Sequence, residues 1–113
     1  MPTFDEREKG FEAKYRHDQE LRFKVGARRN KLLGLWAAGE MGLAGAAAEA
    51  YAREVVQADF ERPGDEDVLE KVVRDFAAKG VERSAHQVRR RMDELMALAR
   101  DQVMKEVKGK KKS

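Results

Sequence analysis

The apolar residues in the N-terminal third of the chain fall into two helical stripes that point in different directions. On a helix that turns about 100° per residue, Phe4, Phe11 and Tyr15 lie within roughly 40° of one another on an otherwise polar segment. A second stripe is offset from the first by roughly 100°. It consists of Leu21, Val25, Leu32, Leu35 and Trp36. One straight helix cannot direct both stripes into one core, so we expect residues 1–18 to form an amphipathic arm that is separate from the folded domain.

The second stripe predicts a first core helix from about Asp18 to Met41, which Gly39 and Gly42 weaken and end. The alanine-rich stretch AGAAAEAYAREVVQADF resumes helical structure, and the Pro-Gly pair that follows it stops this second helix. Small side chains along this stretch favour close packing against a neighbouring helix. Its expected inner face consists of Ala47, Tyr51, Val55 and Ala58.

Two further helices are marked by residues typical of helix ends. Asp65 is expected to be the N-cap of a third helix, the two acids that follow it suit the positive end of the helix dipole, and Gly80 closes the helix. Ser84 and Gln87 form a capping box that opens a fourth helix. The expected apolar faces are Val68, Leu69, Val72, Val73 and Phe76 on the third helix, and Val88, Met92, Leu95, Ala99 and Val103 on the fourth.

Four amphipathic segments joined by short loops, with no alternating apolar and polar run, predict an all-α fold. We expect a four-helix bundle with a flexible N-terminal amphipathic arm and a disordered basic C-terminal tail. The predicted divisions are a disordered arm at residues 1–18, a four-helix domain at 19–107 and the disordered Lys-rich tail KGKKKS at 108–113.

Composition excludes several classes of protein. The chain has no cysteine, which excludes a disulfide framework, a thiolate nucleophile and a zinc ribbon. Its N-terminus carries acids and bases where a signal peptide needs an apolar run, and no stretch approaches the ~20 apolar residues of a membrane span. We therefore expect a soluble, cytoplasmic protein.

No residue pattern predicts catalysis. Only His17 and His86 would titrate near neutral pH without perturbation, and neither has a partner set. Zinc-protease, phosphate-loop, EF-hand and nucleophile-elbow motifs are absent, and the acids at 65–67 suit a helix N-terminus better than a metal site. The sequence predicts no enzyme activity, no cofactor and no metal.

Two basic clusters, ARRNK at 27–31 and VRRRM at 88–92, raise the alternative of nucleic-acid binding. Arg28 falls inside the apolar sector of its helix, so it either pairs with an acid of a neighbouring helix or faces a partner. The three arginines of VRRRM spread over roughly 200° of their helix, which argues against one recognition face. We favour solvated, compensated surfaces, with a generic helical interaction module or a nucleic-acid binder as the alternative function.

The segments TFDERE, EAKYRHDQEL, ARRNKLLGLWAA and DFERPGDEDV closely resemble the zeta subunit of alphaproteobacterial F-type ATP synthases, an ATPase inhibitor family. The likeness covers nearly the whole chain. It departs at the KGKKKS tail and is loose from about Lys79 to His86.

The resemblance implies a mechanism of inhibition. In that family the N-terminal segment is disordered in the free protein. It folds into a helix as it enters an α/β catalytic interface of the synthase head beside the central stalk, and it blocks ATP hydrolysis while leaving synthesis largely free. The implied partners are the α, β and central-stalk subunits on the cytoplasmic side of the membrane. Membrane insertion and nucleic acid are not implied, and the free protein is expected to be a monomer.

Residues of this chain fit that role. The arm offers three apolar anchors and five charged side chains that can pair across a cleft: Phe4, Phe11 and Tyr15, with Asp5, Arg7, Glu8, Lys14 and Arg16. His17 is a candidate for tuning inhibition with pH, although an incidental surface histidine is the favoured interpretation. The first core helix offers Arg28, Arg29 and Lys31 as a docking face for the domain.

Overall fold

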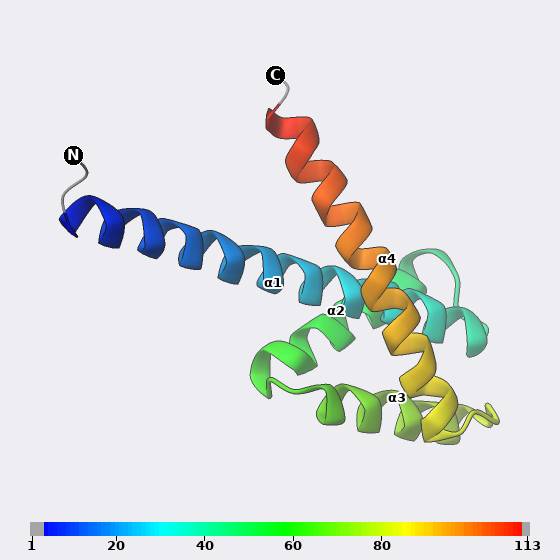
Figure 1. Ribbon diagram of the computed structural model, residues 1–113. Coiled ribbons are helices and arrows are strands. Elements are labelled where there is room, and N and C mark those ends of the chain that lie inside the picture. Colours follow the sequence, from blue (N-terminus) through cyan, green and yellow to red (C-terminus); the bar gives the residue numbers. More distant parts are fainter. Residues whose placement is uncertain (1–3, 112–113) are drawn as a thin grey trace.

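The computed structural model describes the backbone of residues 4–111 and the side chains of residues 18–107. The described chain is all-α and contains four helices, which confirms the predicted fold class. They are α1 (Phe4–Glu40), α2 (Gly45–Glu61), α3 (Asp65–Lys79) and α4 (Ala85–Lys111), as drawn in Figure 1.

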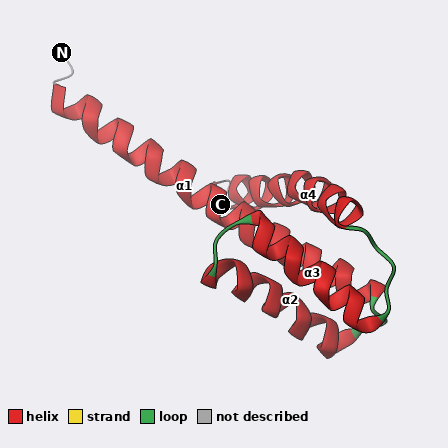
Figure 2. Cartoon of the chain, turned by 90° about the horizontal axis from the view of Figure 1, so that it is seen from below, coloured by secondary structure: helices red, strands yellow, loops and turns green. Residues whose placement is uncertain are grey.

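Each helix packs against the next one in the chain, and α4 returns to pack against α1. α1 packs against α2 and α4, and α3 packs against α2 and α4. Seen from below in Figure 2, α2 and α3 lie side by side near the C-terminal end of α1. The N-terminal part of α1, dark blue in Figure 1, projects away from the other three helices.

The core consists of a main cluster and a smaller one. The main cluster joins all four helices, and the rings of Trp36 and Phe76 meet edge to face within it, with centroids 5.7 Å apart. The smaller cluster lies between α1 and the C-terminal half of α4, where Val25 packs with Ala99 and Val103. α4 therefore extends the core along α1 beyond the reach of α3.

The predicted apolar faces of α3 and α4 are confirmed. All ten predicted residues are buried except Val73, which is half-buried against the main cluster. The face predicted for α1 was too narrow, because it omitted Leu33, Ala37 and Ala38, which are fully buried. α1 packs against two helices on different sides, so its buried sector is wider than one stripe.

The prediction for α2 was wrong at Ala47, which is exposed, whereas Ala52 is buried. The cause is a close approach between α1 and α2. A Cβ atom added at Gly34 would lie 2.5 Å from the Cα of Ala52, so only glycine fits there. This contact sets the rotation of α2 and directs Ala52 and Val55 towards α1.

The helix ends follow local sequence closely. The Ser84 hydroxyl accepts from the Gln87 amide at 3.1 Å, and the Gln87 side chain accepts from the Ser84 amide at 2.9 Å, which confirms the capping box. Gly80 adopts the left-handed conformation, with φ of 73°, and ends α3. The N-cap prediction for Asp65 was wrong: Gly64 holds that position, and Asp65 is the first residue of the helix, where its carboxylate is bound by Arg29.

α1 continues without a break through the predicted arm boundary, since it begins at Phe4. α4 likewise runs to Lys111, into the segment predicted as a tail. The behaviour of residues 1–18 and 108–113 as separate units stays a prediction.

Candidate partner-binding surfaces

The predicted inhibitory residues lie in the projecting part of α1. Their backbone belongs to one helix from Phe4 onwards, and their side chains lie outside the described residues. The predicted inhibitory residues are Phe4, Asp5, Arg7, Glu8, Phe11, Lys14, Tyr15 and Arg16. The side chain of His17 also lies outside the described residues. The side-chain contacts given below therefore start at Asp18, near the point where α1 joins the bundle.

Arg28 pairs with a neighbouring helix, which was one of the two alternatives that its position on the helix allowed. Its guanidinium donates to the Glu106 carboxylate at 2.6 Å and to the Gln102 side chain at 2.9 Å, and both residues lie on α4. The side chain of Arg28 is about a quarter exposed, at 28%. Arg28 therefore ties α1 to the C-terminal part of α4.

Arg29 is buried, with 3% of its surface exposed, and serves an internal network. Its guanidinium donates to the Asn30 side chain at 2.9 Å and to the Asp65 carboxylate at 2.7 Å. Asn30 in turn donates to Asp59 at 2.8 Å, and the other oxygen of Asp59 accepts from the Gly64 amide at 3.3 Å. Two charged carboxylates and a buried guanidinium thus fix the α2–α3 turn against α1.

Sequence reasoning singled out both halves of this network without connecting them. ARRNK and DFERPGDEDV each stood out as specific segments, but Asn30 and Asp59 were not chosen as functional residues. Two sequence signals could have found them: Asn30 is a polar residue at a buried position of its helix, and Asp59 is an acid shortly before the Pro63–Gly64 turn. Only the packing of α2 on α1 shows that they meet.

The three residues of the predicted docking face are not brought together on one surface. Arg28 and Arg29 point to partners within the chain, and Lys31 is exposed. Docking through the first helix therefore needs residues other than these two arginines.

The VRRRM cluster is compensated by acids. Arg89 pairs with Glu66 of α3 at 2.6 Å, and Arg90 and Arg91 both pair with Glu94, at 3.6 and 2.9 Å. The Arg91 guanidinium also lies 5.4 Å from the centre of the Trp36 ring. These contacts agree with the interpretation of a solvated, compensated face.

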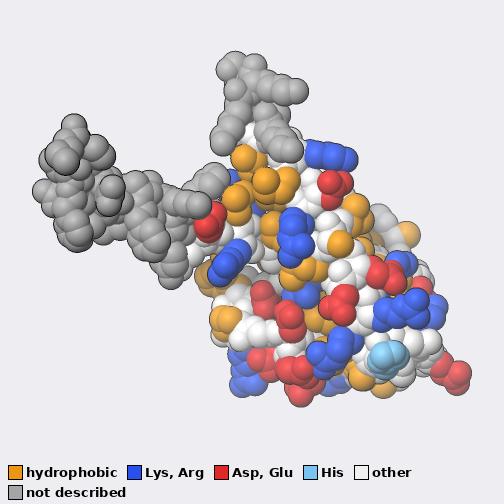
Figure 3. Space-filling model, viewed as in Figure 1, with side chains coloured by type: hydrophobic (Ala, Val, Ile, Leu, Met, Phe, Trp, Pro, Cys, Tyr) orange, Lys and Arg blue, Asp and Glu red, His pale blue; other side chains and the backbone are white. Residues whose placement is uncertain are grey.

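Two apolar grooves flank α1 where it leaves the bundle. One, of about 340 Å³, lies between α1 and the end of α2 and is lined by Phe23, Val56, Phe60 and Pro63. The other, of about 480 Å³, lies between α1 and α4 and is lined by Leu21, Val25, Met96 and Met104. Arg22 lines both grooves. Figure 3 shows apolar side chains gathered on this face next to the grey ends of the chain.

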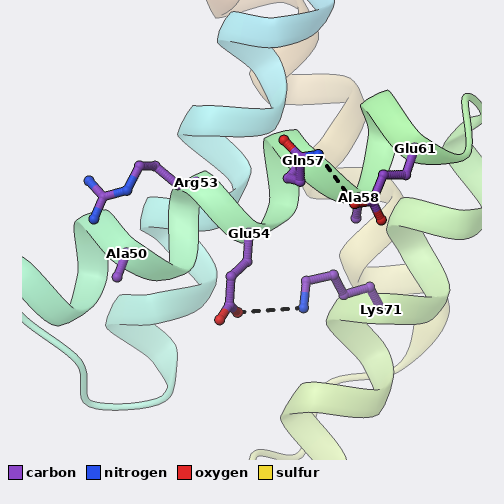
Figure 4. Close-up of a pocket in the computed structure, with 7 residues that line it drawn as sticks. All are labelled: Ala50, Arg53, Glu54, Gln57, Ala58, Glu61 and Lys71. Atoms are coloured by element: carbon purple, nitrogen blue, oxygen red, sulfur yellow. Dashed lines mark hydrogen bonds and ion pairs between the residues drawn. The ribbon is translucent and has the colours of Figure 1, made fainter.

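A further hollow, of about 580 Å³, lies on α2 and α3 and is lined mainly by charged surface residues. Figure 4 shows Glu54 and Lys71 directed towards each other, 3.6 Å apart, and Gln57 bonded to Glu61 at 3.2 Å. The charges at this hollow are matched and solvated, which is typical of an open surface rather than of a catalytic cleft.

Tyr51 is the one described group with a large pKa shift that lies inside the bundle. Burial, and then its hydrogen bond to Asp75 at 2.8 Å, raise the pKa of the Tyr51 hydroxyl far above its ordinary value of about 10. The hydroxyl stays protonated and donates to Asp75, so Tyr51 joins α2 to α3.

Among the described residues, no group of three His, Asp or Glu is placed to hold a metal ion. None of the described helices combines the length and the hydropathy that a membrane span needs.

The whole-chain pattern matches a known family. The family model described as ATPase inhibitor subunit zeta matches residues 1–102. The chain belongs to the ATPase inhibitor subunit zeta family. A search of curated proteins found no match.

A solved structure of a similar protein supports the fold of this zeta family member. It is a solution NMR structure with 50% sequence identity and a TM-score of 0.67, and the alignment covers 76% of this chain and 98% of that one. The family match includes every predicted inhibitory residue and ends before the KGKKKS tail, where the sequence resemblance also departs.

Membership in the zeta family gives this chain an ATPase inhibitor role and makes it a regulatory partner of ATP synthase. The candidate surfaces for this role are the projecting part of α1 and the grooves at its base. The paired charges elsewhere on the described surface serve the bundle itself.

Proposed function

We propose that this chain inhibits ATP hydrolysis by the catalytic head of the F-type ATP synthase. The N-terminal arm, residues 1–18, inserts as a helix at an α/β catalytic interface beside the central stalk and blocks rotation in the hydrolytic direction. The protein acts on the cytoplasmic side of the membrane and is a monomer when free. Family membership supports the inhibitor role, and the shape of α1 supports the route.

The observation that carries the proposal is the projection of α1. One helix runs from Phe4 to Glu40, and its buried residues among those described begin at Val25. Its N-terminal part projects away from the other three helices in Figure 1, which supports its enclosure by a second protein. Within it, Phe4, Phe11 and Tyr15 are the proposed apolar anchors. The charged residues Asp5, Arg7, Glu8, Lys14 and Arg16 are the proposed ion-pair partners across the cleft.

Continuity with the bundle makes helix formation in the arm easier. A separate peptide of this length is marginally helical in water because the first turn fixes several residues for one hydrogen bond. Here the arm continues the helix that includes the packed residues 18–40, so its helical form needs no separate nucleus. Ordering each backbone residue still costs about 1–2 kcal/mol, which the interface with the head must offset.

Removing residues 1–18 tests the proposal. The truncated chain should keep its fold, because every buried residue among those described lies after the cut, and it should no longer slow ATP hydrolysis by the isolated catalytic head. The measurements are the melting temperature and the rate of ATP hydrolysis at increasing inhibitor concentration. The full-length chain is the control.

Full inhibition by the truncated chain would refute the arm mechanism. Failure of the full-length chain to inhibit the cognate head would refute the proposed function itself.

A further inference from the structure

Two phenylalanines are left exposed at the base of the arm. Phe23 on α1 is 67% exposed and Phe60 at the end of α2 is 68% exposed, and both line the groove of about 340 Å³. Val56 and Pro63 also line the groove. Large aromatic side chains that are solvated in the free protein and gathered around one groove are typical of a protein-binding surface.

The groove is built as a rigid feature. The hydrogen bonds from Asn30 to Asp59 at 2.8 Å and from the Gly64 amide to Asp59 at 3.3 Å hold the α2–α3 turn against α1. Both Asn30 and Asp59 line the groove. Asn30 also accepts from Arg29, so one network holds the backbone that carries Phe60 and Pro63 against α1.

The exposed charged side chain in the groove lining is that of Arg22. No acid among the described residues lies within ion-pair distance of Arg22. Asp59, the one acid in the lining, already accepts two hydrogen bonds from within the chain. A partner that offers an apolar side chain next to a carboxylate would satisfy both the groove and Arg22.

The groove follows the arm directly. Phe23 is five residues beyond residue 18, which is about 7.5 Å along a helix. A protein that encloses the arm up to residue 18 therefore reaches the groove with its outer surface. A second copy of this chain is a poorer occupant, since a stable interface needs about 800 Å² from each partner and this groove is small.

We propose that the groove formed by Phe23, Phe60 and Pro63 is a second docking site for the catalytic head, at the mouth of the interface that takes the arm. It binds an apolar side chain flanked by a carboxylate, with Arg22 as the charge partner. This inference rests on the proposed function and adds the bundle to the contact surface. Docking there raises the effective concentration of the arm and slows its escape.

Phe60→Ala tests the docking site, because Phe60 lies on α2 and cannot belong to the inserted helix. The variant should keep the wild-type melting temperature and should release the inhibited head about tenfold faster. Leu98→Ala is the matched control, since Leu98 is a large apolar residue, 44% exposed on α4, that lines neither groove. It should behave as wild type.

Two substitutions of opposite charge at Phe60 sharpen the test. Phe60→Glu should weaken inhibition more than Phe60→Lys, because the proposed occupant is acidic. Equal inhibition by the wild type, Phe60→Ala and Phe60→Glu would overturn the docking site while leaving the arm mechanism intact. A greater loss for Phe60→Lys than for Phe60→Glu would also overturn it. Sedimentation of the free chain that shows a dimer dissociated by Phe60→Ala would assign the groove to a second copy instead.

Discussion

The two parts of α1 belong to one helix but have different surroundings. Residues 18–40 pack against α2 and α4 and contribute Leu33, Ala37 and Ala38 to the core. Residues 4–17 continue the same helix away from the other three, as Figure 1 shows. The bundle part supplies the stability, and we propose that the projecting part supplies the recognition.

This comparison teaches how one helix can serve two purposes without conflict. A substitution in the packed part should change the free energy of unfolding, whereas one in the projecting part should change inhibition alone. The tests below separate these two effects and run from the largest expected change to the smallest.

Gly34→Ala should have the largest effect, and it should be on stability. The added methyl would lie 2.5 Å from the Ala52 backbone, so α1 and α2 must move apart, at a cost of about 3 kcal/mol of unfolding free energy, the upper end for an overpacked core. Gly39→Ala is the matched control: nothing lies within 4 Å of its added Cβ, so the variant should gain up to about 1 kcal/mol. Denaturant unfolding measures both. A Gly34→Ala protein as stable as wild type would show that the two helices are not held so closely.

Phe11→Ala should weaken inhibition while the melting temperature stays unchanged. If Phe11 is an anchor, its removal should cost about 1.5–3 kcal/mol of binding free energy. Inhibitor titrations against the isolated head measure this loss, and calorimetry measures the stability. A clear fall in melting temperature would place Phe11 in the core of the bundle and remove the distinction between the two parts of α1.

His17→Ala should have the smallest effect. His17 lies at the junction of the two parts, and an unperturbed histidine gains its positive charge as the pH falls through about 6.5. We expect the wild type and the variant to inhibit equally at about pH 6 and about pH 8. Stronger inhibition by the wild type at the lower pH, absent in His17→Ala, would identify His17 as a pH modulator.

Much of the fold was predictable because its signals are local. The capping box of Ser84 and Gln87, the closing Gly80 and the apolar faces of α3 and α4 all depend on residues within a few positions of each other. The candidate site was predictable only in part. The arm was chosen from helical phase and family resemblance, whereas the groove of Phe23 and Phe60 joins residues from two helices and left no pattern in the sequence.

Local sequence thus determined that the chain forms four helices, the capped ends of α3 and α4 at Gly80 and Ser84, and which faces of α3 and α4 are apolar, since helical periodicity and capping act over a few residues. Tertiary structure decided the rotation of α2, through the contact of Gly34 with Ala52, and the burial of Arg29, through its ion pair with Asp65. These features depend on groups that are distant in the chain. Whether an arginine docks a partner or binds its own bundle is decided by which carboxylate packing brings within hydrogen-bonding distance.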